Sequence, residues 1–132
     1  MAQSLALTSF LVHDYDEAIE FFKRIRFEVL EDKVITPDRR WVRVAPAGSN
    51  GSGLLLARAT TPEQQAQIGK QAGGRVAFFL ASDDFWEYYD FLQDSGVRFM
   101  EAPRKEPYGM VVVFLDLYGN RWDLIEAATT LA

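Results

Sequence analysis

The chain has 132 residues, of which 48% are hydrophobic and 14% aromatic, so it can form the core of one ordinary domain. Its formal net charge is −5 and it has no stripe of lysine and arginine, which argues against nucleic acid or an anionic membrane surface as a partner. The absence of cysteine excludes disulfides, thiolate metal sites and a cysteine nucleophile. The opening MAQSLALTSFLVHD has no basic segment, and no apolar run reaches about 18 residues, so we expect a cytoplasmic protein.

The first half of the chain predicts a strand, a helix and three more strands. LALTSFLV (Leu5–Val12) has the composition of a strand. Asp14 with Glu17 resembles a capping box, and the apolar residues of DEAIEFFKRI recur at helical spacing. FEVLEDKV (Phe27–Val34) predicts the next strand. RWVRVAP and GLLLARA then form a hairpin around Ala47–Ser52.

A linker and a second series of the same elements follow. TTPEQQAQIGKQAGG predicts a short helix with Thr61 as N-cap and Pro62 at its first position. RVAFFLAS (Arg75–Ser82) predicts a strand, and DDFWEYYDFLQDSG a helix that ends at Gly96. VRFMEA (Val97–Ala102) predicts a further strand, and MVVVFLD and RWDLIEA predict a closing hairpin around Tyr118–Asn120.

The two series are related by a fixed offset. HDYDEAIEFFKRIRFEV and DDFWEYYDFLQDSGVRF align without gaps when Asp14 is placed on Asp84, an offset of 70 residues. The same offset places Val42 on Val112, Asn50 on Asn120 and Leu54 on Leu124. Agreement over about forty positions indicates a duplicated βαβββ unit. We therefore expect one domain with module 1 at about residues 4–59, a linker helix at about 60–74 and module 2 at about 75–128.

Tandem βαβββ units and three motifs resemble the vicinal-oxygen-chelate superfamily of glyoxalases, bleomycin-resistance proteins and extradiol dioxygenases. VHDYDEAIEFF is similar to the family's V-x-D-x-x-x-(A/S)-x-x-F-Y stretch, DDFWEYYDFLQDSGV to its second-module helix, and DLYGNRWDLIE to its closing D-P-x-G-N-x-x-E-(L/I) hairpin. The resemblance covers nearly the whole chain. It implies an α+β fold in which the two curved sheets form a cup with helices packed outside. It also implies a homodimer, with each cup built within one chain or across two.

The resemblance further implies four metal-ligand positions, one in the first and one in the last strand of each module. These fall near Leu7, Gly53, Ala77 and Asp123, and only Asp123 carries a carboxylate. A lone carboxylate does not hold Zn²⁺ or Mn²⁺ against water. We interpret the single histidine, His13, as a surface residue beside the helix N-cap. We therefore expect no cofactor, with a divalent metal as the alternative.

Alternation along the strands predicts which side chains line the cup. Val42 and Val44 have the parity of the core, which turns their neighbours Trp41 and Arg43 toward the cup. The same reasoning adds Val111, Val113, Leu115, Ala77, Phe79, Ala81, Arg121, Asp123 and Ile125. The predicted ligand-binding residues are Trp41, Arg43, Phe79, Tyr108, Val113, Arg121 and Asp123. Each has a structural alternative; for example, Arg43 could pair with Asp123, and Tyr108 could be a turn residue.

Three functions fit these patterns. A metal-free module would bind a small, partly apolar molecule in the cup, where a few polar groups orient it. A glyoxalase-type lyase or isomerase, or a dioxygenase-like enzyme, would use Asp123 with or without a divalent metal; without one, Asp123 would be a general base. A scaffold would have its cup filled by its own side chains. The missing ligands favour the first function over a metal-dependent enzyme, and an open cavity beside Trp41 and Asp123 would favour binding over the scaffold.

Overall fold

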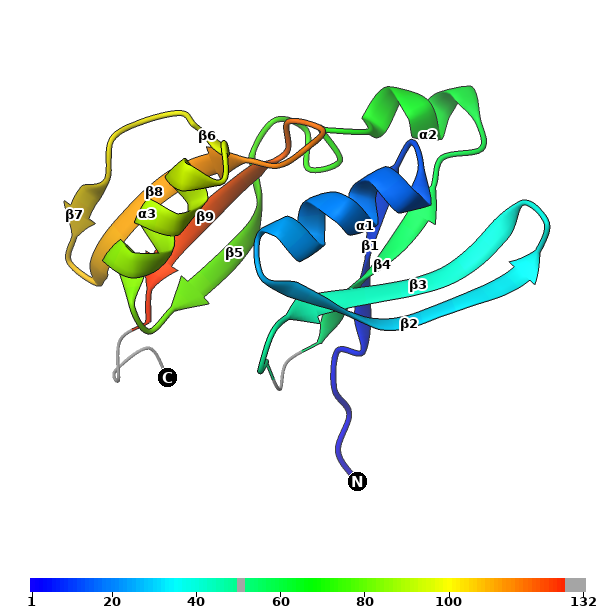
Figure 1. Ribbon diagram of the computed structural model, residues 1–132, viewed down its shortest axis with the longest axis horizontal. Coiled ribbons are helices and arrows are strands. Elements are labelled where there is room, and N and C mark those ends of the chain that lie inside the picture. The colour runs from blue at the N-terminus through cyan, green and yellow to red at the C-terminus, as the bar shows by residue number, and fades with distance from the viewer. Residues whose placement is uncertain (50–51, 128–132) are drawn as a thin grey trace. The chain divides into compact units, whose positions relative to one another are not determined.

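The computed structural model describes residues 1–49 and 52–127 and divides into two compact units, Met1–Ile68 and Gly69–Ala132. Each unit is a mixed α+β structure built on its own curved sheet (Figure 1). Asn50 and Gly51, within the predicted first hairpin turn, and residue 128, at the predicted end of module 2, lie outside the described residues. No helix in the described part of the chain is long and apolar enough to cross a membrane.

The first unit contains four strands and two helices. Its elements are β1 (Leu7–Val12), α1 (Tyr15–Arg24), β2 (Phe27–Thr36), β3 (Arg39–Pro46), β4 (Gly53–Arg58) and α2 (Pro62–Gln67). The strands are ordered β1-β4-β3-β2. β1 runs parallel to β4, and the other neighbours are antiparallel. The predicted order of elements is confirmed here, and β2 extends two residues beyond its predicted end.

Helix α1 packs its apolar stripe on one face of the first sheet. Its N-terminus forms as predicted, because an Asp14 carboxylate oxygen accepts the Glu17 backbone N–H at 2.9 Å and so satisfies a donor that the helix itself leaves unpaired. Phe22 is fully buried, with ring centroids 5.1 Å from Phe10 on β1 and 5.0 Å from Phe27 on β2. The core of this unit therefore lies between α1 and the sheet, and the opposite face is left uncovered by α1.

The second unit repeats the plan with one more strand. Its elements are β5 (Val76–Ser82), α3 (Phe85–Asp94), β6 (Arg98–Phe99), β7 (Arg104–Glu106), β8 (Gly109–Leu115) and β9 (Arg121–Glu126). The strands are ordered β5-β9-β8-β6, and β7 also pairs with β8. As in the first unit, the first and last strands pair in parallel.

The extra strand corrects the prediction of one strand over Val97–Ala102. Only β6 forms there, and β7 was not predicted. After β6 the Met100 N–H still donates to the Val113 carbonyl at 3.0 Å, but the Val113 N–H is accepted at 3.1 Å by the Glu101 side chain and not by a backbone carbonyl, so the regular ladder stops here. Pro103, which has no N–H to give to a ladder, follows, and β7 then resumes pairing.

The closing hairpin of the second unit is organised by Asp116. This carboxylate is 2% exposed and accepts four hydrogen bonds, from Tyr118 N (2.9 Å), Asn120 N (3.1 Å), Asn120 Nδ2 (3.0 Å) and Trp122 Nε1 (2.8 Å). Burial raises the pKa of Asp116, and the four donors act in the opposite direction. Asp116 therefore closes the turn through its buried side chain, and Trp122, which donates to it, lies in the core.

Helices α1 and α3 are each followed, at equivalent positions of the repeat, by a residue with a positive φ angle, but the two residues differ. Gly96, after α3, has φ +83°, as predicted for a left-handed residue. Arg26 occupies the same place after α1 and has φ +70°. A side chain in this conformation meets steric opposition that glycine avoids, so the first unit accepts some backbone strain here.

Candidate functional site

The face of the first sheet opposite α1, hereafter the first open face, carries the residues that alternation predicted. Register places Ser9 beside Leu55, Leu11 beside Ala57, and Leu55 beside Arg43. Trp41 and Arg43 are half-buried on this face, whereas Val42 and Val44 are fully buried on the core side. The predicted core position of Val42 and Val44 is confirmed, and the face is apolar with a polar border along β2 and β3.

Glu31 on β2 holds the two predicted binding residues of this face. One Glu31 carboxylate oxygen accepts the Trp41 indole N–H at 3.1 Å and also bonds Arg43, and the other lies 3.0 Å from the Lys33 ammonium. The Lys33, Trp41 and Arg43 donors lower the pKa of Glu31 to about 2. Within its own unit Arg43 is therefore paired with Glu31, which orients both the Trp41 ring and the Arg43 guanidinium.

A hollow of about 510 Å³ lies at the end of the first open face, and its lining also includes Tyr15 of α1 and the buried Leu56. Its size is within the range of small-molecule sites. It is lined by Ser9, Leu11, Tyr15, Asp38, Arg39, Arg40, Trp41, Leu55, Leu56, Ala57, Arg58, Thr60 and Gln64. The lining joins apolar strand residues to three guanidinium groups and one carboxylate. Trp41 is the one predicted binding residue in it, and Asp123 is not part of it.

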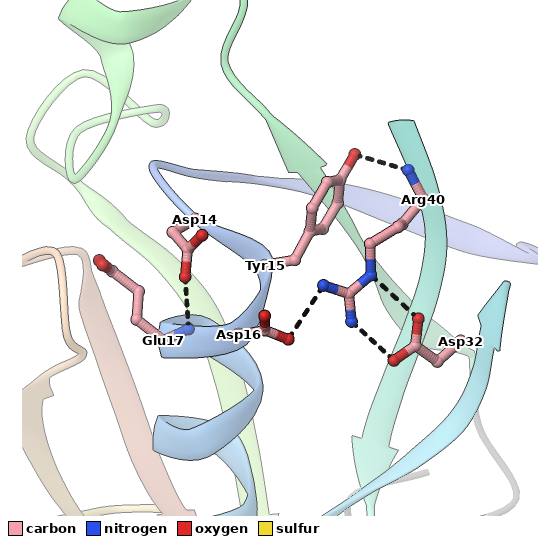
Figure 2. Close-up of polar contacts among 6 residues, drawn as sticks. All are labelled: Asp14, Tyr15, Asp16, Glu17, Asp32 and Arg40. Atoms are coloured by element: carbon pink, nitrogen blue, oxygen red, sulfur yellow. Dashed lines mark hydrogen bonds and ion pairs between the residues drawn. The ribbon is translucent and has the colours of Figure 1, made fainter. Parts of the chain in front are cut away.

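Arg40 fixes one wall of the hollow (Figure 2). Its guanidinium donates two hydrogen bonds to Asp32, at 2.7 and 3.2 Å, and one to Asp16, at 2.9 Å. It also lies 5.2 Å from the centroid of the Tyr15 ring, and the Tyr15 hydroxyl accepts the Arg40 backbone N–H at 3.3 Å. These contacts of Arg40 with Asp16, Asp32 and Tyr15, hereafter the Arg40 lock, connect the β2–β3 hairpin to the start of α1. The two carboxylates raise the pKa of Arg40.

The face of the second sheet opposite α3, the second open face, brings three predicted residues into a row. Register pairs Phe79 with Asp123 and Asp123 with Val113. Phe79 is 67% exposed, which is unusual for a phenylalanine within a strand. Ala77 falls in a register irregularity between Val76 and Phe78. The residue paired with Asp123 is Phe79.

Asp123 is the acid of the second open face with an incomplete set of partners. Its Oδ1 atom is buried without a hydrogen-bond partner among the described residues. Burial raises the pKa of Asp123; the positive charge of Arg104 lowers it and the negative charge of Glu101 raises it further. Arg104 itself bonds Glu101 and Glu106, so it acts on Asp123 only as a nearby charge. Asp123 therefore combines a free acceptor with an elevated affinity for protons.

The remaining two predicted residues of this unit lie far from one another. Tyr108 is 47% exposed in the turn between β7 and β8, next to Gly109. Arg121 is exposed on β9 opposite Leu115, at the other end of β8. The length of β8 separates them by roughly 20 Å. A small molecule on the second open face would therefore contact one of them and not both.

The positions assigned to metal ligands do not supply a donor set. Leu7 and Gly53 are paired neighbours on β1 and β4, and neither side chain can bind a cation. A Cβ on Gly53 would lie 2.5 Å from the Val44 carbonyl oxygen, so a longer side chain there would require the backbone to move. Phe79 stands beside Asp123, and His13 is exposed next to the α1 N-cap, as predicted. Among residues 1–49 and 52–127, no three His, Asp or Glu side chains form a group that could hold a metal ion.

Several residues that shape the two faces were missed by sequence reasoning. Glu31 and Glu101 are themselves 70 residues apart, so the repeat offset could have identified them as a pair. Arg104 lies on β7, which was not predicted. The hollow was missed because it forms where two strands part, and strand alternation carries no signal for that.

Comparison with known proteins agrees with this architecture. The family model described as Glyoxalase/Bleomycin resistance protein/Dioxygenase superfamily matches residues 4–124. An uncharacterized protein of Shewanella frigidimarina (strain NCIMB 400) is 51% identical over 128 residues, which cover 96% of this chain and 95% of that protein. The crystal structure of UcmS2 superposes with a TM-score of 0.82 at 28% identity and covers 96% of this chain and 100% of its own.

A second solved structure is described by the class of molecule that it binds. TnmS3, an antibiotic binding protein from Streptomyces sp. CB03234, has a TM-score of 0.78 and 28% identity, with coverage of 97% of this chain and 99% of its own. The duplicated βαβββ units, the sheet order and these matches define a two-module glyoxalase-like protein. The chain belongs to the glyoxalase/bleomycin resistance protein/dioxygenase superfamily.

Proposed function

We propose that this protein binds a small, partly apolar molecule at the first open face and that it does so without a metal ion. The observation that carries the proposal is the hollow of about 510 Å³ beside Trp41. Leu11 and Leu55 offer apolar contact there, and the Glu31 hydrogen bond holds the Trp41 indole ready to stack on a flat ligand. A ring held in place before binding loses less conformational freedom on contact, which favours affinity.

Two further observations support binding rather than a scaffold or a metal enzyme. The hollow beside Trp41 is open and not filled by the protein's own side chains, which supports binding over a scaffold. Three of the four positions assigned to metal ligands carry Leu7, Gly53 and Ala77, which have no donor atoms in their side chains. The antibiotic-binding description of TnmS3, which shares 28% of its residues with this chain, is consistent with the same type of activity.

The proposal is tested by intrinsic fluorescence after a ligand screen. The protein is treated with a chelator and screened by thermal shift against small aromatic compounds, since a ligand of the native state raises the melting temperature. Compounds that raise it are then titrated against the wild type, Trp41→Phe and the matched control Trp86→Phe, which replaces a residue that is 50% exposed in the other unit. We expect a fluorescence change that disappears in Trp41→Phe and persists in Trp86→Phe.

The opposite pattern would reject the proposal. A signal that persists in Trp41→Phe and disappears in Trp86→Phe would place the ligand elsewhere. Addition of Ni²⁺, Zn²⁺ or Mn²⁺ provides an independent check, because tight binding to the native state must raise the melting temperature. We expect no rise with any of the three ions.

The second candidate is an enzyme that uses Asp123 as a general base, and the buried Oδ1 atom with no partner favours it. The raised pKa of Asp123 increases its basicity, while Phe79 and Val113 provide an apolar surface beside it. This candidate predicts turnover of a carbonyl substrate whose rate falls at least about 100-fold in Asp123→Asn. Equal rates in the wild type and in Asp123→Asn would eliminate it.

A further inference from the structure

We propose that the hollow on the first open face recognises an anionic group, with Arg39 and Arg58 binding a carboxylate, sulfonate or phosphate and Trp41 contacting the apolar body that carries it. This inference rests on the proposed function and names the class of ligand that the same site takes. Guanidinium groups suit such ligands, because their planar N–H donors match two oxygens of an anion and their charge strengthens each hydrogen bond.

The hollow is located where two strands part. β3 pairs with β4 only from Val42–Leu56 to Val44–Leu54, and residues 39–41 and 57–58 lie beyond the paired part. The β2–β3 hairpin diverges from β4 in Figure 1. Side chains replace the missing ladder: the Tyr15 hydroxyl accepts the Arg40 N–H, and an Arg58 Nη2 donates to the Asp38 carbonyl at 3.1 Å. The ends of both strands line the resulting space.

The three guanidinium groups of the hollow differ in availability. Arg40 is bound to Asp16 and Asp32, so its charge is already compensated (Figure 2). Arg39 and Arg58 form no ion pair with any carboxylate of residues 1–49 and 52–127, and the hydrogen bond of Arg58 to the Asp38 carbonyl leaves its other donors available. Two arginines without an ion pair among these described residues therefore border the hollow.

Other groups that line the hollow restrict the charge and the shape of the molecules that it can bind. The Asp38 carboxylate also lines it and opposes the entry of a second anionic group on the same side. Leu11 and Ala57 are paired neighbours on β1 and β4 and supply an apolar surface. The arrangement favours a molecule with one anionic group on an apolar or aromatic body, and disfavours a cationic one.

Two dyes with the same ring system separate this inference from the broader proposal. Anilinonaphthalene sulfonate is anionic, and phenylnaphthylamine is its neutral counterpart. Each is titrated against the wild type, Arg39→Gln, Arg58→Gln, Arg58→Lys and the control Arg98→Gln, which removes an exposed arginine from β6 in the other unit. Trp41→Phe reports whether either dye occupies the hollow, and the melting temperature of each variant confirms that it is folded.

We expect Arg39→Gln and Arg58→Gln each to weaken binding of the sulfonate at least about tenfold, equivalent to about 1.4 kcal/mol, and binding of the neutral dye less than about threefold. Arg58→Lys keeps the positive charge but loses the planar pair of N–H donors, so it should weaken binding of the sulfonate less than Arg58→Gln does. Arg98→Gln should leave that binding unchanged. Equal effects of the arginine substitutions on the two dyes, or no effect on the sulfonate, would overturn the inference and leave small-molecule binding intact. If neither dye responds to Trp41→Phe, the site itself fails.

Discussion

The two open faces share a backbone plan and differ in how their acids are partnered. Glu31, on β2, and Glu101, between β6 and β7, are 70 residues apart and so occupy equivalent positions of the repeat. Glu31 meets Arg43, Trp41 and Lys33, whose donors lower its pKa to about 2. In the second unit the same offset places valines where Arg43 and Trp41 stand, so Glu101 turns instead to Arg104 and to the Val113 N–H.

Because of this difference, Glu31 on the first open face is fully engaged by donors, whereas Asp123 on the second open face has an oxygen without a hydrogen-bond partner among the described residues. The charged groups of the first open face hold its aromatic ring, and a hollow remains beside it. The second open face leaves an Asp123 oxygen buried and unpartnered next to an exposed Phe79. Duplication thus preserved the fold while the two faces acquired different chemistry, because strand pairing depends on the backbone and each face depends on a few side chains.

The largest expected effect comes from Asp116, which has no acidic counterpart in the first unit. Asp116→Ala leaves four donors without their acceptor inside the second unit, and we expect a loss of about 3 kcal/mol of unfolding free energy. Urea denaturation measures it, with the exposed Asp90→Ala as control. A loss below about 1 kcal/mol would show that the closing hairpin does not depend on this carboxylate.

The Arg40 lock should give the next largest effect, since its counterpart at offset 70 is Met110 and only the first unit has it. Arg40→Gln breaks the contacts with Asp32 and Asp16, and we expect a loss of about 1–2 kcal/mol. Asp16→Asn is the control, because the Asp16 side chain is 76% exposed and its pair should contribute less than about 0.5 kcal/mol. Equal losses in the two variants would contradict the central role of Asp32.

Substitution at the end of α1 should have a smaller effect on the unfolding free energy, and here a stabilising one. Arg26→Gly relieves the positive φ of +70° and should stabilise the protein by about 0.5–1 kcal/mol. Gly96→Arg, the reciprocal change, should destabilise it by a similar amount. Thermal unfolding of both variants compares them, and a destabilising Arg26→Gly would mean that the contacts of the Arg26 side chain outweigh the strain.

The smallest expected effects are on the pH dependence of stability. Asp123 on the second open face and Glu31 on the first are expected to change it in opposite directions. The pKa of Asp123 is raised, so its contribution is favourable below the ordinary value of 3.8 and is lost as pH rises through the raised value. Asp123→Asn should therefore stabilise the protein slightly at pH 7, by about 0.5 kcal/mol or less because solvent screens the site, and the gain should vanish on acidification.

Glu31 shows the reverse dependence. Its pKa is lowered from 4.5 to about 2, so its contribution is present above 4.5 and is lost as pH falls toward 2. Glu31→Gln should destabilise the protein at neutral pH, and the deficit should shrink below pH 4.5. Melting temperatures across the acid range measure both variants, and changes of the same sign in Asp123→Asn and Glu31→Gln would refute the contrast between the two acids.

Much of the fold follows from patterns that are visible in the sequence. Asp14 with Glu17, the alternation around Val42 and Val44, and the offset of 70 residues each depend on local or repeated signals, and the structure confirms them. Secondary structure of this kind is predictable because the backbone period determines which side chains can be buried together.

The candidate site was less predictable because it depends on departures from regular pairing. The irregularity at Ala77 places Phe79 beside Asp123, and Glu101 interrupts a strand that composition alone extends to Ala102. The hollow lies where β3 leaves β4, so Arg39 and Arg58 reach it from strand ends. Such features depend on contacts between residues far apart in the chain, which a single sequence does not encode in a visible pattern.

The most direct test of the central claim is a nuclear magnetic resonance titration of the three tryptophan indole N–H signals in chelator-treated protein. The indole of Trp41 donates to Glu31 at the edge of the hollow, Trp86 is on α3, and Trp122 is buried against Asp116. Titration with anilinonaphthalene sulfonate should shift the Trp41 signal in a saturable manner and leave the other two in place. Saturable binding that moves the Trp86 or Trp122 signal and leaves Trp41 unchanged would contradict the account.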